Sequence, residues 1–263
     1  MLRTTRKAHV TLSFPVLGSR GGTLVAVLAI CMAHEASAQR NTGDGFLFSE
    51  PAGSFSIRGG YSGASASSDL FAFTTDQLTL GKSSFSGATA GAEMALRLSP
   101  QFDLSISADY AGVSPRSEFR RLVDQNNQPI RQTTDFRRVP VVASVRAYLT
   151  PRGRSIGRFV WIPNRFTPWV EGGGGFTWFQ FRQYGDFVDY KTNDVFNATS
   201  EASGWAPTAN AAVGADVSLN ARFALTGAAR YTYAKGSLSS DFSGFDRLDL
   251  SGVFTTLGLT VRF

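Results

Sequence analysis

From residue 54 onward, polar and apolar residues alternate over stretches of about ten residues, a period typical of β-strands with two different faces. In the clearest stretch, 102–113, Phe102, Leu104 and Ile106 alternate with Asp103 and Ser105. The full set predicts eight strands, at 54–62, 87–98, 102–113, 137–149, 168–181, 204–219, 222–234 and 248–263. The phase of the fifth strand stays open, because glycines at 172–175 interrupt its alternation.

The connections between these strands alternate in length. The turns at 99–101 and 220–221 are short, whereas the connections at 63–86, 114–136, 182–203 and 235–247 are long. Tight turns at one end and long loops at the other predict an all-β fold, an eight-stranded antiparallel up-and-down barrel. The connection at 150–167 breaks this rule, because it belongs to the turn end and is long.

Alternation alone does not show which face points outward. A soluble ligand-binding barrel hides its apolar face, whereas a membrane barrel exposes it. After residue 38 the lysines are Lys82, Lys191 and Lys235, all in or beside predicted loops, and the last predicted strand ends at Phe263. Aromatic residues gather near strand ends, as in interfacial girdles: Tyr61, Phe102, Trp169, Trp178, Trp205, Tyr231, Tyr233 and Phe263. These features favour a transmembrane β-barrel.

The polar faces of the predicted strands carry an unusual number of charges. An eight-stranded barrel is only wide enough inside for side chains, so we expect these charges to form a hydrogen-bonded network that plugs the lumen. The alternative is an ion-selective path through the same residues. The expected lumen network comprises Arg58, Glu93, Arg97, Asp103, Asp109, Arg138, Arg146, Glu171, Asp216, Arg222, Arg230 and Arg262.

Residues 1–38 have the organisation of a cleavable secretory signal peptide. A basic opening precedes an apolar run at 23–32, and Ala36-Ser37-Ala38 forms a small-residue cleavage site. The run is shorter than the ~20 residues that span a bilayer. An uncleaved anchor and a lipoprotein acylated at Cys31 are the alternatives. We therefore expect export, a short periplasmic N-terminal tail at 39–51 and a barrel at 52–263.

Composition narrows the chemistry of the exported chain. The net charge of +6 falls to +3 without residues 1–38, because that segment holds four of the 26 basic and one of the 20 acidic residues. This balance gives no reason to expect a nucleic-acid partner. Both histidines and the cysteine also lie before residue 39, which excludes disulfides, His/Cys metal sites and imidazole or thiol catalysis afterwards. Paired loop carboxylates (186 with 189, 241 with 246) allow a calcium site, but solvated acids are the simpler interpretation, so we expect no cofactor or metal.

The C-terminal segment Thr-Leu-Gly-Leu-Thr-Val-Arg-Phe has the pattern of the β-signal of bacterial outer-membrane proteins, carried by Thr256, Gly258, Val261 and Phe263. With the signal peptide and eight alternating segments, the chain resembles the small outer-membrane barrels of the OmpA/OmpX type. The resemblance implies a Gram-negative outer membrane, contact with its lipid and lipopolysaccharide, and assembly of the tail by the barrel-assembly machinery. Unlike two-domain OmpA-type members, this chain has no segment after Phe263, so we expect no wall-binding domain.

We expect a non-enzymatic barrel that serves envelope integrity or surface-loop interactions. Among outer-membrane barrels, the lipid A deacylases, the palmitoyl transferases and the larger omptin proteases use a histidine as base or catalytic partner, which the exported chain lacks. The loop at 114–136 is basic enough to meet lipopolysaccharide phosphates, and the loop at 182–203 suits a surface protein partner. A narrow, porin-like channel for small hydrophobic or ionic solutes is the alternative. The 150–167 connection suits a membrane interface or a periplasmic partner through Arg154, Arg158, Phe159, Trp161 and Arg165.

Overall fold

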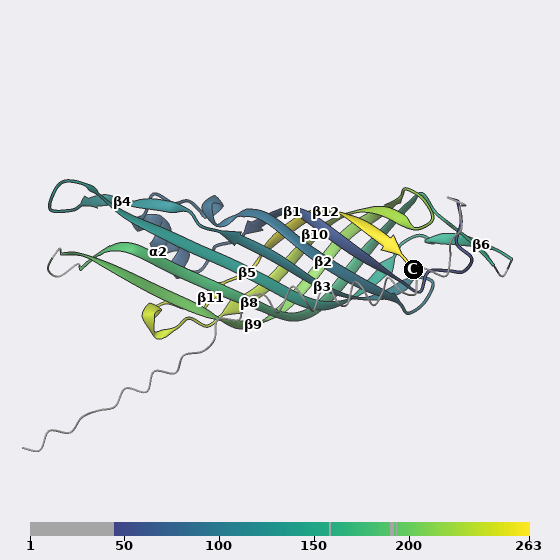
Figure 1. Ribbon diagram of the computed structural model, residues 1–263. Coiled ribbons are helices and arrows are strands. Elements are labelled where there is room, and N and C mark those ends of the chain that lie inside the picture. Colours follow the sequence, from purple (N-terminus) through teal and green to yellow (C-terminus); the bar gives the residue numbers. More distant parts are fainter. Residues whose placement is uncertain (1–44, 158, 190–191, 193) are drawn as a thin grey trace, which may run out of the picture. The chain divides into compact units, whose positions relative to one another are not determined.

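The computed structural model describes residues 45–263 apart from 158, 190, 191 and 193. Its main element is a closed antiparallel barrel of eight strands (Figure 1). In chain order these are β1 (Gly53–Ala64), β2 (Gly87–Arg97), β3 (Phe102–Val113), β5 (Pro129–Tyr148), β8 (Phe166–Val188), β9 (Val195–Ser218), β10 (Phe223–Gly236) and β12 (Gly252–Arg262). The predicted fold class is confirmed, and each predicted strand overlaps one observed strand.

The barrel closes between its first and last strands. β1 pairs with β12 in a register that sets Ile57 opposite Leu259, and β12 pairs with β10 on its other side. Closure matters because lipid cannot satisfy the free edge of an open sheet. We call the end with the tight 98–102 and 219–223 turns, Gly53 and Phe263 the turn end, and the opposite end the loop end.

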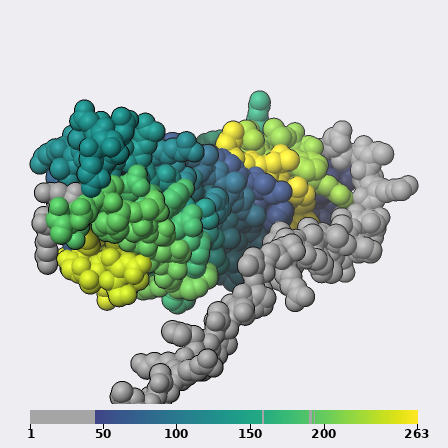
Figure 2. All heavy atoms as spheres, turned by 60° about the vertical axis from the view of Figure 1, so that its left-hand side comes forward, coloured from purple at the N-terminus to yellow at the C-terminus, as the bar shows by residue number. Residues whose placement is uncertain are grey.

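At the loop end, β5, β8 and β9 extend beyond the other strands and reach 20, 23 and 24 residues. β4 (Arg116–Val123) pairs with the added part of β5. The predicted loops at 114–136 and 182–203 are therefore largely strand. In space-filling view the β4 segment, the β8–β9 hairpin and the segment before β11 (Leu248–Asp249) pack together at this end (Figure 2).

The other connections contain short elements. Helix α2 (Asp69–Gln77) and the 3-10 turn η2 (Lys82–Phe85) lie between β1 and β2, and η3 (Ser240–Phe242) precedes β11. The long 150–167 connection contains a hairpin of β6 (Gly153–Ile156) and β7 (Val160–Pro163). In the part of the chain that the structure describes, no helix combines the length and apolar character needed to cross a membrane.

The outer face of the barrel is apolar and its inner face is polar, as in a membrane barrel. Ile57, the most exposed apolar residue of β1, is 65% exposed, whereas the neighbouring Arg58 is buried. Trp169, expected in an aromatic girdle, instead points inward and is 1% exposed. It fixes the phase of β8, in which odd-numbered residues around the glycine run face the interior.

This polarity inverts along the strands that continue past the barrel. Near the middle of β5, Val141 faces outward and Arg146 inward. Closer to the loop end, Phe136 is buried inside and Arg137 faces outward, and Phe179 of β8 is buried at the same level. We expect this inversion to mark the level at which the outer face passes from lipid to water.

Candidate functional site: the barrel interior

Six charged side chains meet at the middle of the lumen and form what we call the central ionic cluster. Three arginines face three carboxylates, so the cluster is formally neutral, and all six residues are at most 9% exposed. Each comes from a different barrel strand, so the cluster crosses the lumen from wall to wall. Its members are Arg58 (β1), Glu93 (β2), Asp109 (β3), Arg146 (β5), Glu171 (β8) and Arg230 (β10).

Glu93 is the hub of this cluster. Its carboxylate accepts hydrogen bonds from Arg58 Nη1 at 2.5 Å, from Arg230 Nη2 at 3.1 Å and from Arg146 Nη2. Arg58 also forms a bidentate interaction with Asp109, in which Nε and Nη2 donate to the two carboxylate oxygens at 2.8 and 2.7 Å. Charge-assisted bonds of this planar geometry are the strong kind and fix each guanidinium in one orientation.

Arg146 joins the cluster to the aromatic filling below it. It bonds Glu171 through Nε at 3.0 Å and Nη2 at 2.7 Å, and its guanidinium carbon lies 3.8 Å from the Trp169 ring centre. Trp169 Nε1 in turn donates to Asp216 at 3.2 Å. The ring fits because residue 214 is glycine: a Cβ there would lie 2.4 Å from the indole.

Toward the loop end, an apolar core replaces the charges. Phe71 of α2 is fully buried there against Phe85, Phe136 and Phe181, with ring centres 4.6, 5.3 and 5.7 Å away. Together with leucines of α2, β11 and the connections beside them, these rings form one continuous buried cluster inside the rim. We call this the loop-end core. Arg138 separates it from the ionic cluster by donating to the carbonyls of residues 250 and 251 and to a serine hydroxyl.

Two carboxylates outside the membrane level stabilise the loop end. Burial disfavours the charged form of Asp249, but hydrogen bonds from Ser67 and Ser251 outweigh this effect and lower its pKa. The same balance lowers the pKa of Asp135, which accepts bonds from Ser114 and Arg182. Both carboxylates therefore hold loop segments best when ionised.

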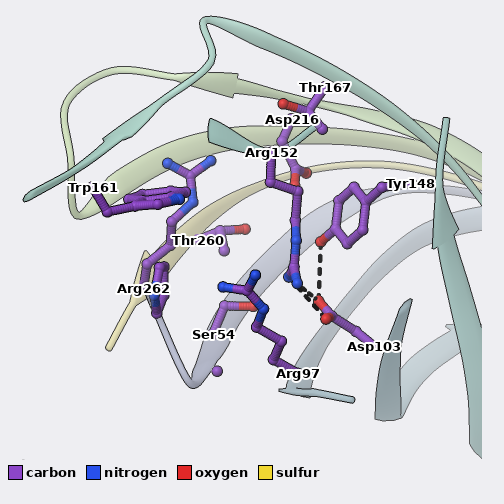
Figure 3. A pocket seen from close by; sticks show the side chains of 12 residues that line it. Ser54, Arg97, Asp103, Tyr148, Arg152, Trp161, Thr167, Asp216, Thr260 and Arg262 are labelled. Carbon is purple, nitrogen blue, oxygen red and sulfur yellow. Dashed lines mark hydrogen bonds and ion pairs between the residues drawn. The ribbon is translucent and has the colours of Figure 1, made fainter. Parts of the chain in front are cut away.

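Toward the turn end, the lumen contains a small pocket of about 30 Å³, room for only a few water molecules (Figure 3). Arg152 donates to both oxygens of Asp103, at 2.8 and 2.9 Å, and Tyr148 OH donates to the same carboxylate at 3.2 Å. Arg97 forms an ion pair with Glu50. The pocket is lined by Pro51, Gly53, Ser54, Arg97, Asp103, Tyr148, Arg152, Trp161, Thr167, Asp216, Thr260 and Arg262.

The structure places eleven of the twelve residues of the expected lumen network inside the barrel, at three levels. Six form the central cluster, Arg138 lies beneath the loop-end core, and four line the turn-end pocket: Arg97, Asp103, Asp216 and Arg262. Arg222 is half-buried in the tight turn before β10. Sequence reasoning missed Arg152, which reaches Asp103 from the anomalous connection, and Trp169. No alternation of polar and apolar residues could have identified Arg152, because it lies outside any strand.

The candidate residues of the 150–167 connection, the interface turn, differ in their exposure to solvent. Phe159 is 70% exposed and Arg154 and Arg165 are exposed, whereas Trp161 is buried in the turn-end pocket. Trp161 pairs there with Leu47 of the N-terminal tail through backbone bonds of 2.9 and 2.8 Å. Arg158 and the expected signal peptide at 1–38 lie outside the described residues. The expected assembly-signal residues belong to the β12 segment, and Phe263 N–H donates to Gly53 O at 3.0 Å.

A closed barrel with an apolar wall and a charged interior defines the class of the molecule, a transmembrane β-barrel of the outer-membrane type. Among the described residues, no cluster of three potential metal ligands occurs.

Comparisons with known proteins give distant structural likenesses alone. No family model matches the chain, and no curated protein matches it. Similar solved structures include the N-terminal barrel of Pseudomonas aeruginosa OprF (10% identity, TM-score 0.35, covering 81% of this chain and 98% of that one). Neisserial surface protein A has 12% identity and a TM-score of 0.42, covering 80% and 96%. The attachment invasion locus protein of Yersinia pestis has 12% identity and a TM-score of 0.37, covering 80% and 99%. At these identities the likeness concerns the barrel fold and does not extend to a ligand or a partner.

Proposed function

We propose that this protein is a non-enzymatic barrel of the outer membrane whose lumen is plugged, so that its role lies in envelope integrity and in contacts made by its loop end. The observation that supports this most strongly is the presence of two different fillings in series. The central ionic cluster spans the lumen at the level of Glu93, and the loop-end core fills it around Phe71. A solute that follows the barrel axis would have to displace both.

Single-channel recording of the refolded protein in a planar bilayer tests the plug. We expect a silent bilayer for the wild type, with folding verified by a heat-dependent gel shift. Arg230→Ala should stay silent as well, because the loop-end core still closes the axis. Arg230→Ala combined with Phe71→Ser and Phe181→Ser should produce discrete openings. Openings in the wild type would refute the plug, and openings in Arg230→Ala alone would refute the second barrier.

A narrow channel is the second candidate, and one observation favours it. The β3–β5 pairing is interrupted after Ala108↔Val141 and resumes at Ala111↔Arg138, beside Pro140, which has no N–H to donate. A lateral path for small solutes would begin at this interruption. Conductance or vesicle swelling that persists when the loop end is fully closed, and that Pro140→Val abolishes, would favour this function over the plugged barrel.

We propose that the loop end contacts lipopolysaccharide phosphates through the basic face of β4 and β5. Arg121 and Arg131 have side chains 76% and 73% exposed, and each forms an ion pair with an exposed acid, Asp76 and Glu118 respectively. Arg121→Glu with Arg131→Glu should reduce the lipopolysaccharide that co-purifies with the protein. Arg154→Glu at the turn end is the matched control, and an equal loss in this control would contradict the assignment.

We also propose that the barrel-assembly machinery recognises the β12 tail. Phe263→Ala should lower the yield of folded barrel in cells, whereas spontaneous refolding of the same variant in detergent should be nearly unchanged. An equal defect in both experiments would show that Phe263 acts only in packing.

A further inference from the structure

The β6–β7 hairpin, at the turn end of the barrel (Figure 1), forms a small sheet with the N-terminal tail. β6 pairs with β7, and Leu47 of the tail pairs with Trp161 on the other side of β7. Trp161 is 3% exposed and lines the turn-end pocket, so its face of the small sheet is turned toward the barrel. Because successive side chains of a strand point to opposite faces, the neighbours of Trp161 and of Leu47 point away from the barrel.

The face that points away from the barrel is apolar and lacks a cover within the described residues. Ile156 is 53% exposed and Phe48 45%, and Phe159, in the turn between the two strands, is 70% exposed. The rings of Phe46 and Phe48 contact each other edge to face, with centres 5.7 Å apart. We call this surface the outward patch, and it consists of Phe46, Phe48, Ile156, Phe159, Val160 and Ile162. Exposed apolar side chains gathered in this way mark a contact with a protein or a membrane.

The outward patch continues the lipid-facing wall of the barrel. The chain enters the hairpin after Leu149 and leaves it into Phe166, and these wall residues are 63% and 59% exposed. Gly153 begins β6 and Pro163 ends β7, so each wall residue lies at most four residues from a hairpin strand. An extended residue spans at most about 3.6 Å, which places the base of the hairpin within about 15 Å of the edge of the wall. The base is therefore held next to the lipid headgroups.

Two arginines beside the outward patch have no acidic partner. Arg154 lies on the outward face of β6, and Arg165 directly precedes the wall residue Phe166; both arginines are exposed. Neither forms an ion pair within the described part of the chain, in contrast to Arg97, which pairs with Glu50. Apolar side chains bordered by unpaired arginines match a surface with an apolar interior and anionic headgroups, which is a bilayer that contains anionic phospholipid.

We propose that the outward patch contacts the bilayer and that Arg154 and Arg165 bind the phosphates of anionic phospholipids. In the orientation expected for such barrels, with short turns on the inner side, these lipids belong to the periplasmic leaflet. The long 150–167 connection is then an anchor on the membrane surface. The inference depends neither on the plug nor on the contacts of the loop end, because it uses none of their residues.

The test uses the refolded chain, without residues 1–38, in vesicles of phosphatidylcholine and phosphatidylglycerol in equal amounts. The only cysteine is Cys31, so Ile156→Cys in the shortened chain carries a single bimane fluorophore. Quenching by nitroxide-labelled phosphatidylcholine measures contact with lipid, and its ratio to quenching by nitroxide-labelled phosphatidylglycerol measures the preference for the anionic lipid. Phe102→Cys on the wall and Asn126→Cys at the loop end are the lipid-exposed and water-exposed references.

We expect quenching at Ile156→Cys close to that at Phe102→Cys, with phosphatidylglycerol preferred. An arginine near an anionic surface strengthens binding about fivefold, so Arg154→Gln and Arg165→Gln should each lower this preference by about that factor. Arg247→Gln, at an exposed arginine of the loop end, is the matched control and should leave the preference unchanged. The heat-dependent gel shift verifies that each variant is folded.

Three results would overturn the proposal. An unchanged preference for phosphatidylglycerol in Arg154→Gln and Arg165→Gln would exclude the phosphate contacts. Quenching at Ile156→Cys as low as at Asn126→Cys would place the outward patch in water, open to a periplasmic protein. Protection from water that appears only at high protein-to-lipid ratio, without quenching by lipid, would assign the outward patch to a second copy of the chain.

Discussion

Glu93 gives the most direct test of how the central ionic cluster contributes to stability. Its carboxylate contacts three arginines, and the side chains of all four residues are at most 8% exposed. Glu93→Gln keeps the shape and one acceptor oxygen but leaves three arginines facing two carboxylates. Removing one partner of a buried ion pair costs about 3–5 kcal/mol, chiefly because the other charge stays buried and uncompensated. Since the amide oxygen still accepts one bond, we expect a loss near 3 kcal/mol of unfolding free energy.

The measurement is reversible urea unfolding in lipid vesicles, monitored by tryptophan fluorescence and by the heat-dependent gel shift. Glu118→Gln is the matched control: it makes the same chemical change in an exposed pair with Arg131 and should cost less than about 1 kcal/mol. Glu93→Gln with Arg230→Gln restores neutrality and should recover at least about 1 kcal/mol relative to Glu93→Gln. If Glu93→Gln lost no more stability than Glu118→Gln, the lumen charges would have to be hydrated, and the argument for a dry ionic plug would fail.

Three further predictions address the outer wall, the loop-end core and pH. Ile57→Lys places a charge on the 65% exposed outer face near mid-barrel and should cost about 2–4 kcal/mol in vesicle unfolding if lipid covers that face; no loss would contradict a transmembrane wall. Phe71→Ala should loosen the loop-end core, so that limited proteolysis cuts residues 65–86 faster while the barrel keeps its gel shift; unchanged cleavage would show that the ring is not needed there. The lowered pKa of Asp249 means that its contribution is present at neutral pH and is lost as pH falls through its folded-state value, below the usual 3.8. The protection of the Ser67 and Ser251 amides, taken relative to the intrinsic exchange rate at each pH, should therefore fall on acidification, and Asp249→Asn should show low protection at every pH; an acid response preserved in Asp249→Asn would assign the effect to another group.

The barrel itself was predictable because a strand that lies between two different environments must alternate polar and apolar residues. That alternation can be read directly from the sequence. Stretch 102–113 coincides with β3, and the polar positions around Glu93 and Arg146 identified the inward face without any structural input. The contacts among those charges were not predictable. Which carboxylate meets which arginine depends on strand register and tilt, and the sequence pattern does not encode either of them.

The loop end was the part that sequence reasoning described least well. The sequence pattern was followed by looking for apolar residues on the outer face of each strand. This pattern stops where the outer face becomes polar, so the predicted strands that correspond to β5 and β8 end at Arg137 and Phe181. In fact both strands continue, and Phe136 and Phe181 are buried on their inner faces. Trp161 was predicted as part of the interface turn, but neither its place nor that of Arg152 in the barrel mouth could be predicted. Both belong to a connection, and only the folded chain brings them to the turn-end pocket.

The two fillings follow from the two solvents that surround the same strands. At the level of Ile57 the outer face must be apolar for lipid, and an apolar inner face would make each strand apolar on both sides, prone to aggregate before the barrel closes. Charges that neutralise one another, as Glu93 and its arginines do, fill the lumen without that liability. From Arg137 toward the loop end the outer face is polar, as expected for a surface in water. The inner face is therefore free to be apolar, and Phe71 packs there as in a soluble core. The position of the inversion therefore predicts the edge of the bilayer: spin labels on β5 should report lipid at Val141 and water at Arg131. The same environment at both positions would separate the inversion from the membrane boundary.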